Sequence, residues 1–425
     1  MKRITIISVA LVIILAIPLQ AARIHIDISA PGFSKLKIAM PYFTGPSTLT
    51  SDTWSMIEKD IKISGVFELI DPRTYIHTGP MTEIKPGTLK DWSLIGADFV
   101  ITGSVERQED NVRLSAQIIE LPTAKVLVYK TYITSGKTLY MAVHKLMDDL
   151  LAESFDLQGL FSTKIASIVK RGDKRYLYIA FPDGTGARVI KGLGDLILNP
   201  VWSPDGKHIA FVSYRRDNPD LYILDLEAVM VSPMATYTGI NSSPAFHPDG
   251  KHIACTLSKD GNPEIYMIDL KNKDATRLTN NWATDTSPSF SPNGNKMVFC
   301  STRGGSPQIY IKDLKSRKVN RLTFEGNYNT EPVFSPRGDW IAFTHAKNGV
   351  FHIAIIRPDG TDMRALQGTN KGDESPFFSP DGRLLVFGCA DGHLYITALA
   401  GNPPVKITTD KGAFSEPCWS VIKKR

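Results

Sequence analysis

The sequence predicts an all-β, six-bladed β-propeller preceded by a smaller α/β domain. Three observations lead to this prediction. A seven-residue pattern returns at a fixed spacing in the second half of the chain, and each copy is followed by further strand-like runs. The region before residue 160 lacks the pattern and alternates helix-like with strand-like segments. A period of about 40–50 residues with several short strands per unit is typical of propeller blades.

The repeat reads Pro-x-aromatic-Ser-Pro-Asp-Gly, with small changes between copies. Its five full copies start 44 residues apart, at Pro200, Pro244, Pro288, Pro332 and Pro376. A sixth start, at Pro417, is followed by Cys418, Trp419 and Ser420 and goes no further. Ser-Pro-Asp-Gly favours a type I turn, because Pro presets φ at the second position and Gly suits the last. The repeat therefore predicts an inner strand that ends in a tight turn.

Three more strand-like runs follow each copy, such as 341–343, the Tyr-centred run 264–270 and 277–279. The stretch 164–191 carries these later runs without a first one, whereas the chain end supplies a first run alone. Joining the two closes the ring and leaves no long sheet edge exposed. Five complete units and this shared one make six blades. In the first unit, Val231, Ser232 and Pro233 are expected to disrupt the fourth strand.

Residues 22–160 are predicted to form the α/β domain, with an N-terminal tail at 22–34, and residues 161–425 the propeller. Apolar spacing predicts helices around Trp54, Ile57 and Ile61, over 89–95, and from Leu139 to about Phe155. Strands are expected at 35–40, 67–70, 97–106, 112–120 and 125–134.

The first residues have the pattern of a secretory signal peptide. Lys2 and Arg3 precede an apolar run over 4–17, and small residues follow. The run is too short to favour a membrane-spanning helix. We expect residues 1–21 to be removed, with cleavage after Ala21, and the protein to be exported and soluble.

The four cysteines, Cys255, Cys300, Cys389 and Cys418, allow three pairings into two disulfides. Three of them sit at or near the end of apolar strand runs, and neighbouring blades rarely bring Cα atoms within about 7 Å. We therefore expect four free thiols, with Cys255 the firmest case of a buried apolar side chain.

Charge and motifs narrow the function. The net charge of +6 includes no long basic block, so no nucleic-acid partner is expected. No His-Glu-x-x-His, Cys-x-x-Cys or Gly-x-Ser-x-Gly pattern occurs, so no local motif supports a zinc site or the nucleophile elbow of a hydrolase.

Two classes of function stay open: a non-enzymatic binding scaffold, and a propeller enzyme such as a lactonase or hydrolase that uses channel residues. Lactone or ester turnover that is lost in Glu331→Ala would favour the enzyme.

Polar residues recur just before the first proline of each unit, where the inner strand begins. As a ring they should line one mouth of the central channel, a concave surface suited to binding. These residues are Asn199, Asn241, Ser242, Ser243, Asp285, Thr286, Ser287, Asn329, Thr330, Glu331, Asp373, Glu374, Ser375, Ser415 and Glu416. The carboxylates among them could hold Ca²⁺, and no other cofactor is expected.

The signal peptide, the α/β domain with Gly65-Val66-Phe67 and the run 97–103, and the six-bladed propeller together resemble the TolB family. The resemblance covers essentially the whole chain after the signal peptide. It implies a periplasmic component of the Tol-Pal system, which maintains outer-membrane integrity and takes part in cell division.

In that family the propeller mouth binds the peptidoglycan-associated lipoprotein Pal, and the N-terminal segment engages TolA. Ser243 and Thr286 match family positions implicated in Pal binding, while Ile240 stands where the family can carry His. The tail 22–29 alternates apolar and polar residues and could add to a partner's sheet edge or fold back. We expect a monomer held at the outer membrane through Pal. The predicted binding residues are Ile240, Asn241, Ser242, Ser243, Asp285, Thr286, Thr330, Glu331, Glu374 and Glu416 at the mouth, and Ile24, His25, Ile26 and Asp27 in the tail.

Overall fold

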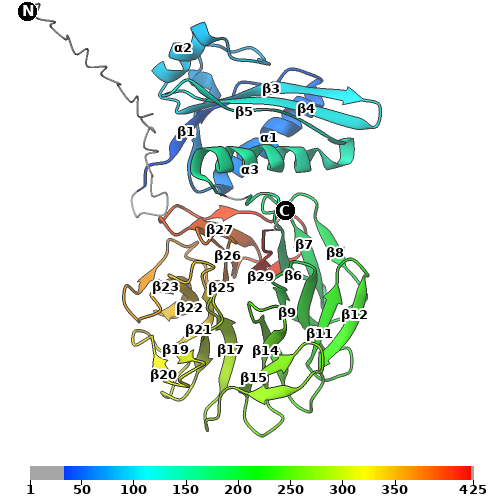
Figure 1. Ribbon diagram of the computed structural model, residues 1–425, viewed down its shortest axis with the longest axis vertical. Coiled ribbons are helices and arrows are strands. Elements are labelled where there is room, and N and C mark those ends of the chain that lie inside the picture. The colour runs from blue at the N-terminus through cyan, green and yellow to red at the C-terminus, as the bar shows by residue number, and fades with distance from the viewer. Residues whose placement is uncertain (1–32, 158, 423–425) are drawn as a thin grey trace, which may run out of the picture.

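The computed structural model describes residues 33–157 and 159–422 (Figure 1). The predicted signal peptide and the tail residues Ile24, His25, Ile26 and Asp27 lie outside this part of the chain. Within it, an α/β domain lies against one side of a β-propeller (Figure 1). None of the helices in the described ranges is long and apolar enough to cross a membrane.

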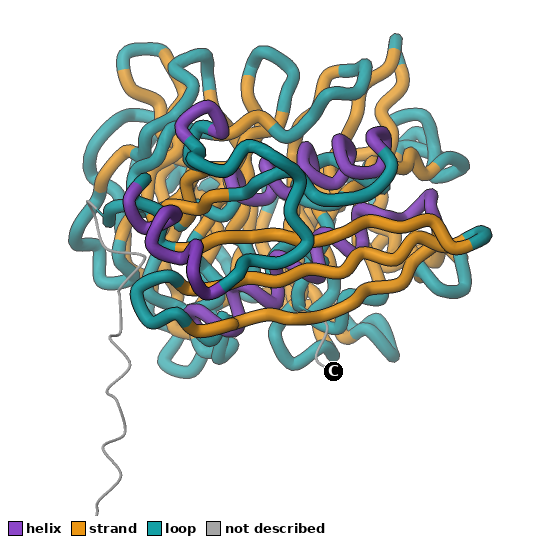
Figure 2. Tube along the Cα trace, turned by 90° about the horizontal axis from the view of Figure 1, so that it is seen from above, coloured by secondary structure: helices purple, strands orange, loops and turns teal. Residues whose placement is uncertain are grey.

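The α/β domain is built on a five-stranded sheet with the order β2-β1-β3-β4-β5. β1 pairs in parallel with β2 and β3, whereas β3, β4 and β5 form an antiparallel meander. The strands are β1 (Leu36–Ala39), β2 (Phe67–Leu69), β3 (Phe99–Gln108), β4 (Asn111–Glu120) and β5 (Lys125–Ser135). The long strands lie side by side over the propeller (Figure 2). All five predicted strands are present within a few residues of their expected bounds.

The helices are α1 (Ser47–Ile63), α2 (Leu89–Leu94) and α3 (Leu139–Phe155). α1 and α3 lie between the sheet and the propeller (Figure 1). Their apolar faces join one core that runs from the sheet into the propeller, for example from Ile57 and Leu146 to Leu384 and Trp419. The amphipathic spacing in the sequence therefore did mark the buried faces of both long helices.

The propeller has six antiparallel blades of four strands each, as predicted. We number the blades along the chain from the first full repeat. Blade 1 contains β9 (Ile197–Trp202), β10 (His208–Ser213), β11 (Asp220–Asp225) and β12 (Met230–Ala235). Blade 2 contains β13 (Asn241–Phe246), β14 (His252–Leu257), β15 (Glu264–Asp269) and β16 (Ala275–Arg277). Blade 3 contains β17 (Asp285–Phe290), β18 (Lys296–Ser301), β19 (Gln308–Asp313) and β20 (Val319–Arg321).

Blades 4 to 6 complete the ring. Blade 4 contains β21 (Asn329–Phe334), β22 (Ile341–Lys347), β23 (Val350–Ile356) and β24 (Arg364–Ala365). Blade 5 contains β25 (Asp373–Phe378), β26 (Leu384–Cys389), β27 (Leu394–Ala398) and β28 (Val405–Lys406). Blade 6 combines β29 (Ala413–Trp419) with β6 (Ile165–Arg171), β7 (Lys174–Ala180) and β8 (Arg188–Ile190).

Blade 6 is the shared blade that the sequence predicted. β29 pairs with β6, with Trp419 opposite Ile165 and Phe414 opposite Val169. The Trp419 indole N–H also donates to Thr163 Oγ1 at 2.7 Å. Because strands from the two ends of the repeat region pair here, the ring closes and β6 has a hydrogen-bonded neighbour on its channel side.

The fourth strand of blade 1 corrects one prediction. We expected Val231, Ser232 and Pro233 to disrupt it, yet β12 runs over six residues and pairs with β11 from Met230 to Ala235. Pro233 is tolerated because β12 is the outermost strand of its blade. On an edge strand, the missing N–H can face solvent without breaking the ladder.

The four cysteines, Cys255, Cys300, Cys389 and Cys418, are free and buried. Burial raises the pKa of the Cys300 thiol to about 11. The prediction of buried thiols is therefore confirmed.

A buried polar group joins the two domains. His144 on α3 lies between Asp60 on α1 and Asp183 in the turn after β7, with Nδ1 2.8 Å from Asp60 Oδ2 and Nε2 3.4 Å from Asp183 Oδ1. All three side chains are fully buried. Burial disfavours the charged imidazole, but the carboxylates of Asp60 and Asp183 outweigh it and raise the pKa of His144 above its ordinary value. The domains are thus tied by a desolvated ion pair.

We expect His144→Ala to destabilise the protein by about 3–5 kcal/mol, because removing one partner of a buried ion pair leaves the other charge unpaired. Denaturant unfolding followed by circular dichroism measures the loss. Lys174→Ala, which removes an exposed pair with Asp195, is the control and should leave the unfolding midpoint close to wild type. If both variants unfold at the wild-type midpoint, the buried group does not hold the domains together.

Candidate functional site

Each inner strand carries a β-bulge just before its proline. The residue before the proline has a positive φ between 48° and 55° in all six blades, and the register with the second strand shifts there. Such a conformation is uncommon outside glycine, and a bulge re-aims the side chain it carries. All six residues line a channel cavity of about 440 Å³. We call them the channel ring: Asn199, Ser243, Ser287, Glu331, Ser375 and Glu416.

Four residues that were expected at the mouth lie elsewhere. Asn241, Asp285 and Asn329, the first residues of β13, β17 and β21, are fully buried inside their blades. Asp373 at the start of β25 is buried in the same way. Side chains alternate along a strand, so the first residue of an inner strand points into the blade when the second residue faces the channel. The bulge then turns the third position toward the channel as well.

These buried residues anchor the loops that lead into the inner strands. Asp285 accepts a hydrogen bond from Arg303 Nη2 at 2.6 Å, and Asn241 Nδ2 donates to the carbonyl of Tyr237 at 2.7 Å. Asp373 accepts from the backbone N–H of Thr369 at 2.8 Å. Their polarity therefore serves the fold, and the prediction that they line the mouth is wrong.

The other predicted residues do lie at the mouth. Ser242, Thr286 and Thr330 are partly exposed at the second position of their inner strands, and Glu374 is exposed. Thr286 is the register partner of Cys300 on β18, which places it beside the neighbouring strand of its own blade. We call the face of the propeller where the inner strands begin the mouth face.

The mouth face also carries exposed apolar side chains, of which only Ile240 was predicted from the sequence to take part in binding. The side chains of Trp282 and Phe324 are 78% and 74% exposed, and those of Tyr328 and Ile240 are 40% and 41% exposed. All four lie in loops that lead from the outer strand of one blade into the inner strand of the next. Large exposed apolar side chains mark interaction surfaces. The aromatic residues a few positions before the polar stretches of blades 3 and 4 were the signal in the sequence.

Two ring carboxylates link neighbouring blades. Glu331 in blade 4 accepts hydrogen bonds from Ser375 N at 3.0 Å and Ser375 Oγ at 3.1 Å in blade 5. Glu416 in blade 6 accepts from the backbone and side-chain N–H groups of Asn199 in blade 1. Each carboxylate thus bonds to the ring residue of the next blade. Both glutamates stabilise the ring in addition to facing the channel.

The ring concentrates negative charge. Burial raises the pKa of Glu416 to about 7, and the Glu331 carboxylate adds to the effect while the Asn199 N–H and Arg175 oppose it. Burial and Glu331 likewise raise the pKa of Glu374. A hard cation would relieve this repulsion, so calcium in the channel stays a prediction, although among the described residues no three of these carboxylates bring their ligand atoms within 4.8 Å of one another. Asp285 and Asp373 are engaged inside their blades.

The fold and the mouth face together define a two-domain propeller protein with a surface suited to binding another protein. Residues 155–423 match the family described as the TolB beta propeller domain, and residues 24–127 match the TolB amino-terminal domain. The chain belongs to the TolB family, as the sequence predicted.

Named relatives agree with this assignment. The chain is 31% identical over 227 residues to the Tol-Pal system protein TolB of Dechloromonas aromatica, covering 53% of this chain and 52% of the relative. It is 32% identical over 242 residues to that of Alcanivorax borkumensis, covering 56% and 55%. The chain thus spans about half the length of these curated relatives. The crystal structure of TolB from Acinetobacter baumannii superposes with a TM-score of 0.80 at 28% identity, covering 93% of this chain and 98% of that one.

The raised pKa of Glu416 predicts a pH-dependent stability. The folded state keeps this proton to about pH 7, whereas the ordinary value is 4.5, so stability falls as the pH rises between the two. Glu416→Gln has no proton to lose. Relative to wild type, its unfolding free energy should therefore rise by roughly 2–3 kcal/mol between pH 4.5 and pH 8. Denaturant titrations at both pH values measure the difference, and Glu325→Gln in an exposed loop is the control. A difference from wild type that is constant with pH would contradict the prediction.

Proposed function

We propose that this protein is a non-enzymatic, periplasmic scaffold of the Tol-Pal system that binds the lipoprotein Pal at its mouth face. The observation that carries the proposal is the set of exposed apolar side chains around the polar channel ring: Ile240, Trp282, Phe324 and Tyr328. Aromatic anchors beside polar, partly buried groups are typical of protein interfaces. The assignment to the Tol-Pal system is inferred from the names of the relatives, which are Tol-Pal system proteins.

The geometry of the ring supports a scaffold over an enzyme. Glu331, the residue that a channel hydrolase would use, accepts hydrogen bonds from Thr344 Oγ1 at 2.9 Å and from Ser375. Glu416 is bound to Asn199 in the same way. A general base needs a free lone pair directed at the substrate proton. Carboxylates that are bonded to the next blade suit a rigid docking surface better.

We further propose that the tail engages TolA, with Ile24, His25, Ile26 and Asp27 adding as a strand to the edge of a TolA sheet. The alternation of apolar and polar residues in 22–29 supports this role. The protein would then act as a monomer, attached peripherally to the outer membrane through Pal. Through these two contacts it would support outer-membrane integrity and cell division.

Calorimetric titration with the soluble domain of Pal from the same organism tests the mouth face. Wild type should bind one Pal per chain. Trp282→Ala should weaken binding at least tenfold, because a buried aromatic anchor contributes about 2 kcal/mol or more to an interface. Thr286→Arg and Ser243→Arg should also weaken it by obstructing the mouth.

The matched control is Thr276→Arg, which places the same side chain on the exposed outer strand β16. It should bind Pal like wild type. Equal affinity of Trp282→Ala, Thr286→Arg and wild type would place the Pal site elsewhere. No binding by wild type would favour the enzyme alternative, which the lactone and ester assay with Glu331→Ala then tests.

Deletion of residues 22–29 from the mature chain tests the tail. TolA binding, measured by the same titration, should be lost because the added strand is gone. Full-length mature protein is the reference. A change in Pal affinity on the same deletion would show that the two sites are coupled. Unchanged TolA affinity would exclude the tail as the TolA site.

A further inference from the structure

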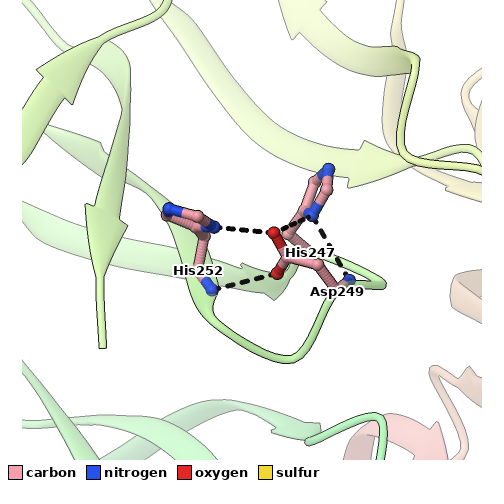
Figure 3. Close-up of side chains that lie close together, drawn as sticks. All are labelled: His247, Asp249 and His252. Atoms are coloured by element: carbon pink, nitrogen blue, oxygen red, sulfur yellow. Dashed lines mark hydrogen bonds and ion pairs between the residues drawn. The ribbon is translucent and has the colours of Figure 1, made fainter. Parts of the chain in front are cut away.

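The turn of blade 2 begins with a residue that none of the other blades has at that position. Here the chain reads His247-Pro248-Asp249-Gly250-Lys251-His252. The position of His247 is a serine in the other five blades: Ser203, Ser291, Ser335, Ser379 and Ser420. In blade 2 the two imidazoles lie on either side of the Asp249 carboxylate at the tip of the β13–β14 turn (Figure 3).

The three side chains bring their ligand atoms together. Asp249 Oδ2 lies 3.0 Å from His247 Nδ1 and 2.7 Å from His252 Nδ1. All three atoms lie within 4.8 Å of one another. Around a tetrahedral ion with bonds of about 2.0–2.2 Å, ligand atoms are about 3.3 Å apart. For one ion to touch all three ligand atoms, the carboxylate oxygen would have to move away from the two nitrogens by about 0.3 and 0.6 Å, and rotation of the imidazoles would have to bring their nitrogens to the same spacing.

The hydrogen bonds of His247 leave its Nδ1 as an acceptor. Its Nε2 lies 3.3 Å from the carbonyl of Gly294, which can only accept, so Nε2 carries the hydrogen. The backbone N–H of Asp249 points at Nδ1 from 3.3 Å. Nδ1 also lies 3.0 Å from Asp249 Oδ2, so a cation bound to both atoms would replace this long N–H hydrogen bond and relieve the contact between the nitrogen lone pair and the carboxylate oxygen. A backbone carbonyl on the far nitrogen is the usual support of a metal-bound histidine.

His252 is oriented in a similar way. Its Nδ1 faces Asp249, and its Nε2 lies 3.8 Å from the carboxylate of Asp269 on β15. The ring of His247 is held in place by an edge-to-face contact with Phe290, with centroids 4.9 Å apart. Each potential ligand therefore has a second group that fixes its direction.

The site is open to solvent. The side chains of His247, Asp249 and His252 are 18%, 33% and 37% exposed. An ion can reach them, and a water or a partner side chain can complete its coordination. The buried group of Asp60, His144 and Asp183 offers no such access, because all three side chains are fully enclosed.

Blade 1 shows what the turn looks like without the second histidine. Ser203 Oγ donates to Asp205 Oδ1 and accepts the backbone N–H of His208 at 2.9 Å, which closes the turn. His208 lies 3.7 Å from Asp205. A serine thus meets every need of the turn, and the extra imidazole in blade 2 is not required for folding.

We propose that His247, Asp249 and His252 bind one divalent transition-metal ion, Zn²⁺ above others, through two imidazole nitrogens and one carboxylate oxygen. Imidazole favours Zn²⁺ over Mg²⁺ and Ca²⁺, which prefer oxygen ligands alone. With three protein ligands, the fourth position stays open. The site lies at the turn end of the inner strands, away from the mouth face, so it is independent of Pal binding.

The test is calorimetric titration of the mature, tag-free protein with Zn²⁺. Wild type should bind one ion per chain at this site. His247→Ser installs the residue of the other five turns, so it should fold normally and bind Zn²⁺ at least tenfold more weakly. His252→Ala should do the same from the other side of the ion. His208→Ala in blade 1 is the matched control and should bind like wild type.

Cobalt provides a second readout. Co²⁺ at the site should give visible absorption bands that His247→Ser removes. Zn²⁺ binding that is equal in wild type, His247→Ser and His252→Ala would overturn the proposal by placing the ion elsewhere. Absence of zinc binding by folded wild type would overturn it as well.

Discussion

The pairing of β29 with β6 is the interaction on which the rest of the structure depends. It joins the last strand of the chain to the first strand after the α/β domain and so closes a ring of blades. Without it, blade 6 would lose its inner strand and β6 would expose an unpaired edge. The same blade supplies Phe414 and Trp419 to the core shared with the α/β domain. It also carries Glu416, whose carboxylate bonds to Asn199 in the next blade.

Within the closed ring, the same β-bulge occurs in all six inner strands and carries different side chains. Every inner strand turns the residue before its proline into the channel through a bulge with positive φ. Identical backbone geometry then presents serine in three blades, asparagine in one and glutamate in two. Substitutions at such repeated positions change the chemistry without changing the fold. Blade 2 follows the same rule at its turn, where histidine replaces serine.

The two ends of the inner strands have different surroundings. Beyond the turn of blade 5, Arg383 donates to the carbonyl of Ser64, and Asn402 donates to that of Gly65, so this end meets the α/β domain. The mouth face at the other end keeps Trp282 and Phe324 exposed. A close-packed propeller between them separates a surface used for internal docking from one available to a partner.

Features that depend on local pattern could be predicted from the amino-acid sequence: the period of 44, the turns, the six blades with the shared one, and the helix faces around Ile57 and Leu146. These follow from spacing, because each element is specified by residues a few positions apart. The inward orientation of Asn241 and Asp285 could not be predicted in this way, because a bulge shifts the alternation that the strand pattern predicts. Tertiary packing also brings His144 to Asp60, which are 84 positions apart. A contact at such a separation depends on how α1 and α3 pack against each other, and no local pattern encodes it.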